Sequence, residues 1–230
     1  MRKEVLVSSE SPEFIHPTSA AAAFGKKPSS SDSPEFIHPT PAVAAFDEQP
    51  SPHGDLTSVL ISKEQLASRI AQMGADITQD YADKNPLLIG VLKGAVYFMT
   101  DLTRRIDCPL TMDFMAVSSY GDAHRSSGVV RIIKDLNEPV TDRHVIILED
   151  ILDTGLTLKY LARNFHGRGA ASIAIATLLL KEGTQAVPLD VQYVGFTIPD
   201  AFVVGYGLDY AQHYRNLPYI GILKPALYAE

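Results

Sequence analysis

Residues 145–157 read Val-Ile-Ile-Leu-Glu-Asp-Ile-Leu-Asp-Thr-Gly-Leu-Thr, and this stretch constrains the fold more than any other part of the chain. A short run of Val, Ile and Leu predicts a strand that is buried on both faces of a parallel sheet. The spacing of Leu158, Leu161 and Ala162 predicts a helix directly after the Gly/Thr-rich turn. Because ligands bind at the carboxyl ends of the strands in such sheets, we expect the acidic residues and the turn to form the functional site.

The turn at Thr154, Gly155 and Thr157 has the chemistry of a phosphate site. It combines a helix N-terminus with free amides, a glycine that allows close approach of the backbone, and two hydroxyl groups. Carboxylates placed directly on a phosphate would repel it, so Glu149 and Asp150 should face sugar hydroxyls or act through a bound cation. The plainer alternative is that the acids cap the helix or are solvated in an ordinary turn.

Residues 149–157 resemble the phosphoribosyl pyrophosphate signature of the type I phosphoribosyltransferases, in the hypoxanthine-guanine version of the bacterial-type enzymes. The resemblance extends from about Asp55 to the C-terminus and implies an α/β fold: a central, mainly parallel sheet flanked by helices, with a small hood over a purine site. Further segments match in the family's order: the pyrophosphate loop 91–95, the lid 118–121 with 126–128, Lys181 after an apolar run, the purine segment 202–209 and the arginine segment 214–217 just after it.

The resemblance implies a role for each matched residue, and also that the peptide bond before the lysine of the pyrophosphate loop is often cis. Asp153 would be the catalytic base near N7 of the purine. The other implied contacts are Glu149, Asp150, Thr154, Gly155 and Thr157 for ribose and phosphoribosyl pyrophosphate; Lys93, Gly94 and Arg215 for pyrophosphate; Ser119 and Tyr120 in the lid; Lys181, Phe202 and Val203 for the purine; and Glu149, Asp150 and Asp209 for Mg²⁺.

The implied base-reading residue, Lys181, favours 6-oxopurines, because an ammonium donates to O6 but is mismatched against the amino group of adenine. Many family members carry an arginine shortly after this lysine, whereas residues 182–185 are Glu-Gly-Thr-Gln here, which weakens any second basic contact. The plainer alternatives are a solvated lysine at a strand end, an inward-facing strand aromatic at Phe202, and a surface pair of Asp209 with Arg215.

The implied reaction converts hypoxanthine, and guanine, with phosphoribosyl pyrophosphate to IMP or GMP and pyrophosphate. Its transition state resembles an oxocarbenium ion, so catalysis should come from positioning and electrostatics, with Mg²⁺ on the pyrophosphate. A regulatory RNA-binding protein on the same fold is the main rival, but Asp153 and the net charge of −7 speak against it. A transferase for xanthine stays open.

Composition fits one domain that begins near residue 55. The chain has 230 residues, 46% of them hydrophobic, which is enough for one substantial core. The lone Cys108 excludes an internal disulfide and fits a reducing cytosol, and no apolar run is long enough to span a membrane. We therefore expect a cytoplasmic protein without nucleic-acid or membrane partners, and the resemblance implies a homodimer or homotetramer formed around the Lys93 loop.

Residues 1–54 have a different composition, and we expect them to be a disordered tail. The sequence Ser-Pro-Glu-Phe-Ile-His-Pro-Thr occurs at 11–18 and again at 33–40, each copy leading into an alanine-rich segment. The duplicated segment could be a docking motif, although we favour a drifted or misassigned extension. Acidic residue Glu4 and the polar residues that follow argue against a signal peptide.

The remaining segments alternate between strand and helix patterns, which predicts right-handed crossovers in a parallel sheet. Ser62 and Gln65 have the spacing of a capping box for a helix that ends near Tyr81. We expect Met112, Phe114 and Ala116 to alternate against Asp113 on one strand. The other predicted elements are helices at 96–106 and 158–165, strands at 87–92, 110–118, 129–134, 144–148 and 172–180, and hood strands at 191–196, 202–206 and 219–223.

Overall fold

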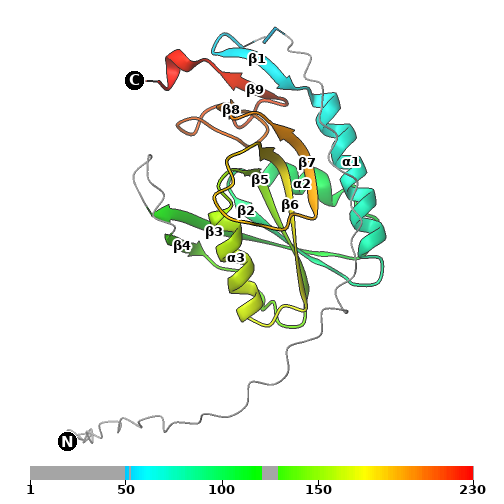
Figure 1. Cartoon of the computed structure of the whole chain (residues 1–230). Coiled ribbons are helices and arrows are strands. Elements are labelled where there is room, and N and C mark those ends of the chain that lie inside the picture. Colours follow the sequence, from blue (N-terminus) through cyan, green and yellow to red (C-terminus); the bar gives the residue numbers. More distant parts are fainter. Residues whose placement is uncertain (1–49, 52, 121–128, 230) are drawn as a thin grey trace, which may run out of the picture. The chain divides into compact units, whose positions relative to one another are not determined.

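A six-stranded sheet forms the centre of the structure, a computed structural model that describes residues 50, 51, 53–120 and 129–229, without the side chains of residues 119, 120 and 129 (Figure 1). All neighbouring strands run parallel except β4, which is antiparallel to β3. This confirms the mainly parallel sheet. The strand order is β4 (Val129–Lys134), β3 (Thr111–Tyr120), β2 (Leu87–Leu92), β5 (His144–Leu152), β6 (Ser172–Lys181) and β7 (Tyr193–Ile198).

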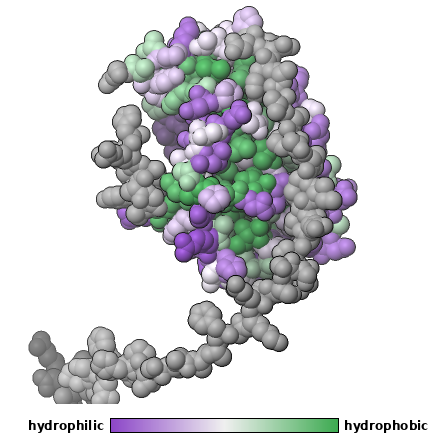
Figure 2. Space-filling view, in the orientation of Figure 1, coloured by the Kyte–Doolittle hydropathy of each residue, from purple (hydrophilic) through white to green (hydrophobic). Residues whose placement is uncertain are grey.

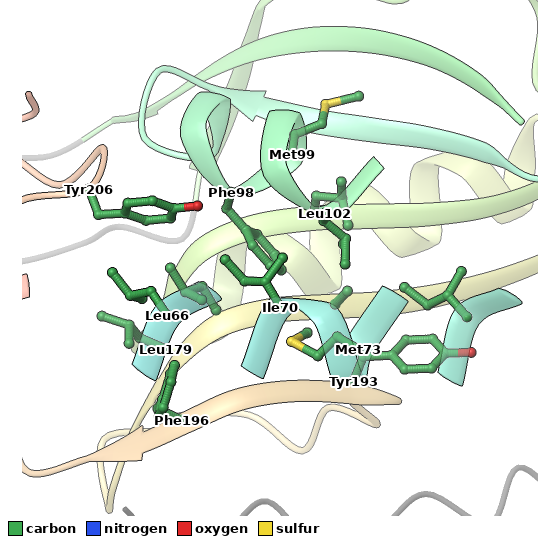
Figure 3. Close-up of a cluster of buried hydrophobic side chains, with 14 of the residues drawn as sticks. Leu66, Ile70, Met73, Phe98, Met99, Leu102, Leu179, Tyr193, Phe196 and Tyr206 are labelled. Atoms are coloured by element: carbon green, nitrogen blue, oxygen red, sulfur yellow. The ribbon is translucent and has the colours of Figure 1, made fainter. Parts of the chain in front are cut away.

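Both faces of the sheet are covered, as the apolar strand at β5 predicted. Val145 and Ile147 belong to a core cluster with α3 (Leu156–Gly167), whereas Ile146 and Leu148 belong to a second cluster with α1 (Lys63–Asp80) and α2 (Val96–Thr103). Successive side chains of a strand point to opposite faces, so the continuous apolar run supplies both clusters. Figure 3 shows the second cluster, in which Ile70 of α1 lies against Phe98 of α2.

The helices confirm most of the predicted boundaries. Ser62 and Gln65 form the predicted capping box at the start of α1, and Tyr81 follows its last residue. Helix α2 ends at Thr103, three residues earlier than predicted. There the amides of Arg105 and Ile106 donate to carbonyls three residues back, a tighter turn that ends the α-helix.

The hood is a separate three-stranded antiparallel sheet in the order β1 (Leu56–Ile61), β9 (Ile220–Leu223), β8 (Val203–Val204). Strand β1 was missed by the sequence analysis. The prediction that residues 191–196 belong to the hood was wrong, because β7 pairs with β6 in the central sheet. In Figure 2 apolar side chains gather near the middle of the visible face, over the central sheet, with polar ones around them.

The predicted facing of β3 was also wrong. Met112 is 46% exposed, whereas Asp113 is buried. The carboxylate of Asp113 accepts hydrogen bonds from the amides of Phe114 and Asn137, both at 2.7 Å, and lies 3.5 Å from the ammonium of Lys134. A buried charge is tolerated when it is paired and hydrogen-bonded. These partners therefore allow Asp113 to be buried, although the alternation of apolar residues predicted the opposite face of β3.

Several predictions lie outside the described residues. They include the disordered tail, its duplicated segment and the lid residues 126–128, and the boundary at residue 54 also stays a prediction. Within the described residues, no helix combines the length and the apolar character needed to cross a membrane.

The packing of α1 on the end of α2 gives a stability prediction. A Cβ atom at Gly74 would lie 2.7 Å from the carbonyl oxygen of Arg105, whereas one at Gly167 would meet nothing within 4 Å. Overpacking costs about 1–3 kcal/mol, more than the roughly 1 kcal/mol that alanine adds to a helix. We expect Gly74→Ala to lower Tm by roughly 2–6 °C in a thermal melt. The matched control Gly167→Ala should not lower it, and equal melting of both variants would contradict the packing.

Candidate active site

A cavity of about 270 Å³ lies where the carboxyl ends of β5 and β6 face the hood. Carboxyl strand ends are the expected place for a ligand in such a sheet. Six predicted site residues line this one cavity, although they come from three separate segments of the chain. The lining residues are Asp150, Ile151, Asp153, Lys181, Ala201, Phe202, Val203, Leu208 and Asp209.

Glu149 and Asp150 lie near the end of β5, where each residue is only partly exposed and their adjacent carboxylates are electrostatically unfavourable. Burial, and then the neighbouring charge of Asp150, raise the pKa of Glu149 well above its usual range. Among the described residues, Oε2 of Glu149 has no hydrogen-bond partner. Burial also raises the pKa of Asp150 to about 6, although the amide of Ile151 and the charge of Arg215 oppose this effect. The pair therefore suits a ligand that brings hydroxyl donors or a cation.

The Gly/Thr-rich turn after β5 leads directly into the N-terminus of α3. Gly155 has φ +79° and is the N-cap of α3, so the first amides of the helix point at the turn. Two residues in and next to the segment 182–185, which lacks the expected arginine, hydrogen-bond to the backbone of this turn. The hydroxyl of Thr184 donates to the carbonyl of Asp153 at 3.2 Å, and the amide of Ala186 donates to the carbonyl of Thr154 at 3.0 Å.

The Lys-Gly loop after β2 packs directly against Asp150. The Leu92–Lys93 peptide bond is cis, which confirms the expectation from the resemblance. A Cβ atom at Gly94 would overlap the carboxylate of Asp150, and one at Gly207 would overlap the carbonyl oxygen of Gly94. The absence of a side chain at these two glycines therefore lets the carboxylate of Asp150, the backbone of Gly94 and the backbone of Gly207 meet.

An ion pair joins Asp209 and Arg215, with 2.7 Å between Oδ1 and Nη2. Both side chains are mostly buried, at 24% and 22% exposed, so this is no freely solvated surface pair. Arg215 also donates to the carbonyl of Gly207 at 2.6 Å, and the amide of Gln212 donates to Asp209 at 2.8 Å. The ammonium of Lys93 donates to Gln212 at 3.0 Å, which links the hood to the Lys-Gly loop.

Lys181 and Phe202, the residues predicted to meet the purine, each make a contact that the sequence did not lead us to expect. Nζ of Lys181 lies 2.9 Å from Oδ1 of Asp200, and the lysine side chain is only 16% exposed. Lys181 of β6 pairs with Ile198 of β7 in the sheet, and Asp200 follows Ile198 by two residues. Correct placement of β7 would therefore have brought Asp200 close to Lys181. The ring of Phe202 stacks on that of Tyr228, a contact that no local sequence pattern signals.

The predicted lid residues are only partly covered by the structure. Ser119 and Tyr120 lie at the end of β3, but their side chains are outside the described parts. Thr157 lies in the first turn of α3, beside the predicted phosphate turn. The lid therefore stays a prediction, whereas the other predicted residues come together at the carboxyl edge of the sheet.

The fold and this arrangement define the phosphoribosyltransferase class. Residues 60–211 match the family model described as "Phosphoribosyl transferase domain", and the chain belongs to that family. Its relatives include the hypoxanthine-guanine phosphoribosyltransferase of Bacillus subtilis, which is 56% identical over 174 residues, 76% of this chain and 97% of that protein. A crystal structure of a hypoxanthine phosphoribosyltransferase from Staphylococcus aureus has 47% sequence identity and a TM-score of 0.75, covering 77% of this chain and 97% of that one.

Some relatives are much longer than this chain. The bifunctional protein TilS/HprT of Listeria innocua is 55% identical over 180 residues, which are 78% of this chain and only 28% of that protein. The similarity to such proteins therefore concerns one part of their length.

The raised pKa of Asp150 predicts that the ligand-free protein becomes less stable as pH rises. Because the pKa of Asp150 is about 6 in the folded protein and about 3.9 in an unfolded chain, the folded state holds this proton more tightly. This tighter proton binding adds to the free energy of unfolding below about pH 4. The added stability is lost as pH rises through about 6, a change of up to about 3 kcal/mol.

We therefore expect Asp150→Asn to raise Tm of the ligand-free protein at pH 8 and to change it little at pH 4.5. Melts across this pH range measure the effect. Asp83→Asn, at an exposed position after α1, is the control. An Asp150→Asn variant that is less stable at pH 8 would show that the carboxylate is already neutralised.

Proposed function

We propose that this chain transfers the phosphoribosyl group of phosphoribosyl pyrophosphate to N9 of hypoxanthine, and of guanine, in purine salvage. The observation that carries the proposal is the single cavity that joins Asp153, Lys181 and Phe202 beside the acid pair. The relatives in Bacillus subtilis and Streptococcus pneumoniae, both named hypoxanthine-guanine phosphoribosyltransferase, support the same reaction.

The base would lie between the aromatic ring of Phe202 and the apolar side chains on the opposite wall. Ile151 and Leu208 line the same cavity and are suited to cover a flat, apolar ring. The ammonium of Lys181 would donate to O6, and the main chain of Val203 would meet the base edge. Xanthine differs only at C2, where the described residues offer no side chain that clearly selects against it.

The sugar and its phosphates would occupy the edge of the sheet next to this cavity. Glu149 and Asp150 would accept from the ribose hydroxyls, which relieves the burial of two carboxylates. The 5-phosphate would be held by the amides and hydroxyls of the turn, at Thr154, Gly155 and Thr157. The pyrophosphate would meet the Lys93–Gly94 backbone and the guanidinium of Arg215, whose Nε is buried without a partner among the described residues.

In the transfer step, N9 of the base would form a bond to C1 of the ribose while the bond from C1 to the pyrophosphate oxygen breaks. Positive charge develops on the sugar, and the carboxylates at the end of β5 would stabilise it electrostatically. Asp153 would accept the proton at N7, so that the purine becomes neutral as it is joined to the sugar. Ser119 and Tyr120 would close over the site and exclude water.

Magnesium fits this site as part of the substrate complex. Among the described residues, no three His, Cys, Asp or Glu side chains gather closely enough to hold a metal alone. Mg²⁺ commonly binds through one or two carboxylates together with substrate phosphates, a role open to Glu149, Asp150 and Asp209. When bound, it would neutralise the charge that develops on the leaving pyrophosphate.

The proposal includes a cytoplasmic location and a homodimer or homotetramer. A single cysteine in the chain suits a reducing compartment. Tyr97, which follows the Lys93 loop, is 42% exposed and provides an aromatic surface in the region expected to form the contact between subunits.

Substitution of the proposed base tests the catalytic step. We expect Asp153→Asn to lower kcat for IMP formation by roughly 10²–10⁴-fold, the usual contribution of a general acid or base. Tm should change little because Asp153 is exposed. Initial rates with saturating phosphoribosyl pyrophosphate and Mg²⁺ measure the effect. Asp83→Asn should retain full activity, and a fully active Asp153→Asn variant would remove this residue from the mechanism.

Substitution of the proposed base-reading residue tests the purine pocket. We expect Lys181→Met to lower kcat/KM for hypoxanthine about 10- to 100-fold, the loss of one hydrogen bond to a charged group. KM for phosphoribosyl pyrophosphate should stay within about 2-fold because Lys181 lies at the purine side of the cavity. Steady-state kinetics with each substrate varied separately give both values. Equal losses for the two substrates would indicate general damage to the site.

A further inference from the structure

The ring of Phe202 is held by two tyrosines that the proposed reaction does not use. Tyr228 stacks on it, with ring centroids 4.7 Å apart and an angle of 25° between the planes. Tyr210 meets it edge-on, at 5.6 Å and 86°. Both are preferred arrangements of aromatic pairs, so Phe202 has a defined position before any base binds.

Tyr228 belongs to a C-terminal segment that is itself fixed to the hood. This segment follows β9 and includes the 3₁₀-helix Pro225–Leu227. The hydroxyl of Tyr210 donates to the carbonyl of Leu227 at 2.8 Å, and the amide of Lys224 donates to the carbonyl of Asp55 at 3.0 Å. The amide of Tyr228 donates to the carbonyl of Pro225 at 3.1 Å. The last residues of the chain thus have a specific place beside the purine cavity.

Phe202 lines the cavity, but neither Tyr228 nor Tyr210 does. Tyr228 therefore stacks on Phe202 without lining the cavity itself. We propose that Tyr228 is a positioning residue for the purine, which it supports from behind through a continuous stack of tyrosine, phenylalanine and base. This inference rests on the proposed function for the identity of the base, but the contact between the two rings does not.

The physical role of Tyr228 would be to restrict the Phe202 ring. Phe202 lies directly before the two-residue strand β8, so its own strand offers little packing on either side. A stacked neighbour removes alternative rotamers, and a ring that is already in place binds the base with less loss of entropy. Base stacking exists in the substrate complex and in the transition state alike, so its loss should raise KM and leave kcat nearly unchanged.

The test compares three variants of the full chain: Tyr228→Ala, Tyr228→Phe and Leu227→Ala. Leu227 is the matched control, because it is 41% exposed, is the neighbour of Tyr228 (37% exposed) and makes its contact with Tyr210 through its backbone. Titration calorimetry would give Kd for IMP, which carries a base, and for phosphoribosyl pyrophosphate, which carries none. Steady-state rates would give KM for hypoxanthine and kcat, and thermal melts would show whether each variant is folded.

We expect Tyr228→Ala to weaken IMP binding and to raise KM for hypoxanthine by about 3- to 10-fold, the range for an aromatic pair. Kd for phosphoribosyl pyrophosphate and kcat should change by less than about 2-fold. Tyr228→Phe keeps the ring and should bind as the unchanged chain does, as should Leu227→Ala. If Tyr228→Ala destabilises the fold, the intermediate variant Tyr228→Leu should still show the selective loss of IMP affinity at a temperature where it is folded.

Three results would overturn the inference: unchanged IMP affinity in Tyr228→Ala, an equal loss of affinity for both ligands, or tighter IMP binding. The last would mean that Tyr228 competes with the base for Phe202. Failure of the proposed function is a separate outcome, because the unchanged chain would then form no IMP and bind none.

Discussion

The structure depends on one close approach, the packing of the Gly94 backbone between the carboxylate of Asp150 and the backbone of Gly207. This contact brings the end of β2, the end of β5 and the hood loop to one point. A side chain at either glycine would clash at this point, so at least one of these segments would have to move. Two further interactions hold the hood loop, residues 205–217, over this point. They are the ion pair between Asp209 and Arg215 and the hydrogen bond from Lys93 to Gln212.

The electrostatics of the site follow from the same convergence. Glu149 and Asp150, near the end of β5, are only partly exposed, and desolvation of their carboxylates raises both pKa values, so the protein itself does not fully compensate their charge. Next to them, the turn before α3 and Arg215 form a region suited to anions. A substrate with hydroxyls between two phosphate groups, and with an accompanying cation, matches both regions at once. Under the proposed function, local charge complementarity would account for binding of the sugar, and Lys181 with Phe202 would account for the choice of base.

Most of the fold could be predicted from the sequence because its signals are local. The apolar run of β5, the capping box of α1 and the glycine at the start of α3 each depend on neighbours within a few residues. The wrong predictions concern residues and strands whose placement depends on partners far away in the sequence. Asp113 is buried through Asn137 and Lys134, and β1 is fixed by β9 at the other end of the chain. The site residues could be named from the resemblance, whereas Asp200 and Tyr228 required the sheet register and the hood.

The central claim is that this cavity selects a 6-oxopurine for transfer of the phosphoribosyl group. The most direct test is nucleotide formation by the purified chain with phosphoribosyl pyrophosphate and Mg²⁺, offered hypoxanthine, guanine, xanthine, adenine and uracil in separate reactions. Rapid formation of IMP and GMP, with adenine and uracil unreactive, is the predicted result. Formation of AMP in preference to IMP would contradict the role of Lys181, and the absence of product from every base would contradict the proposed reaction itself.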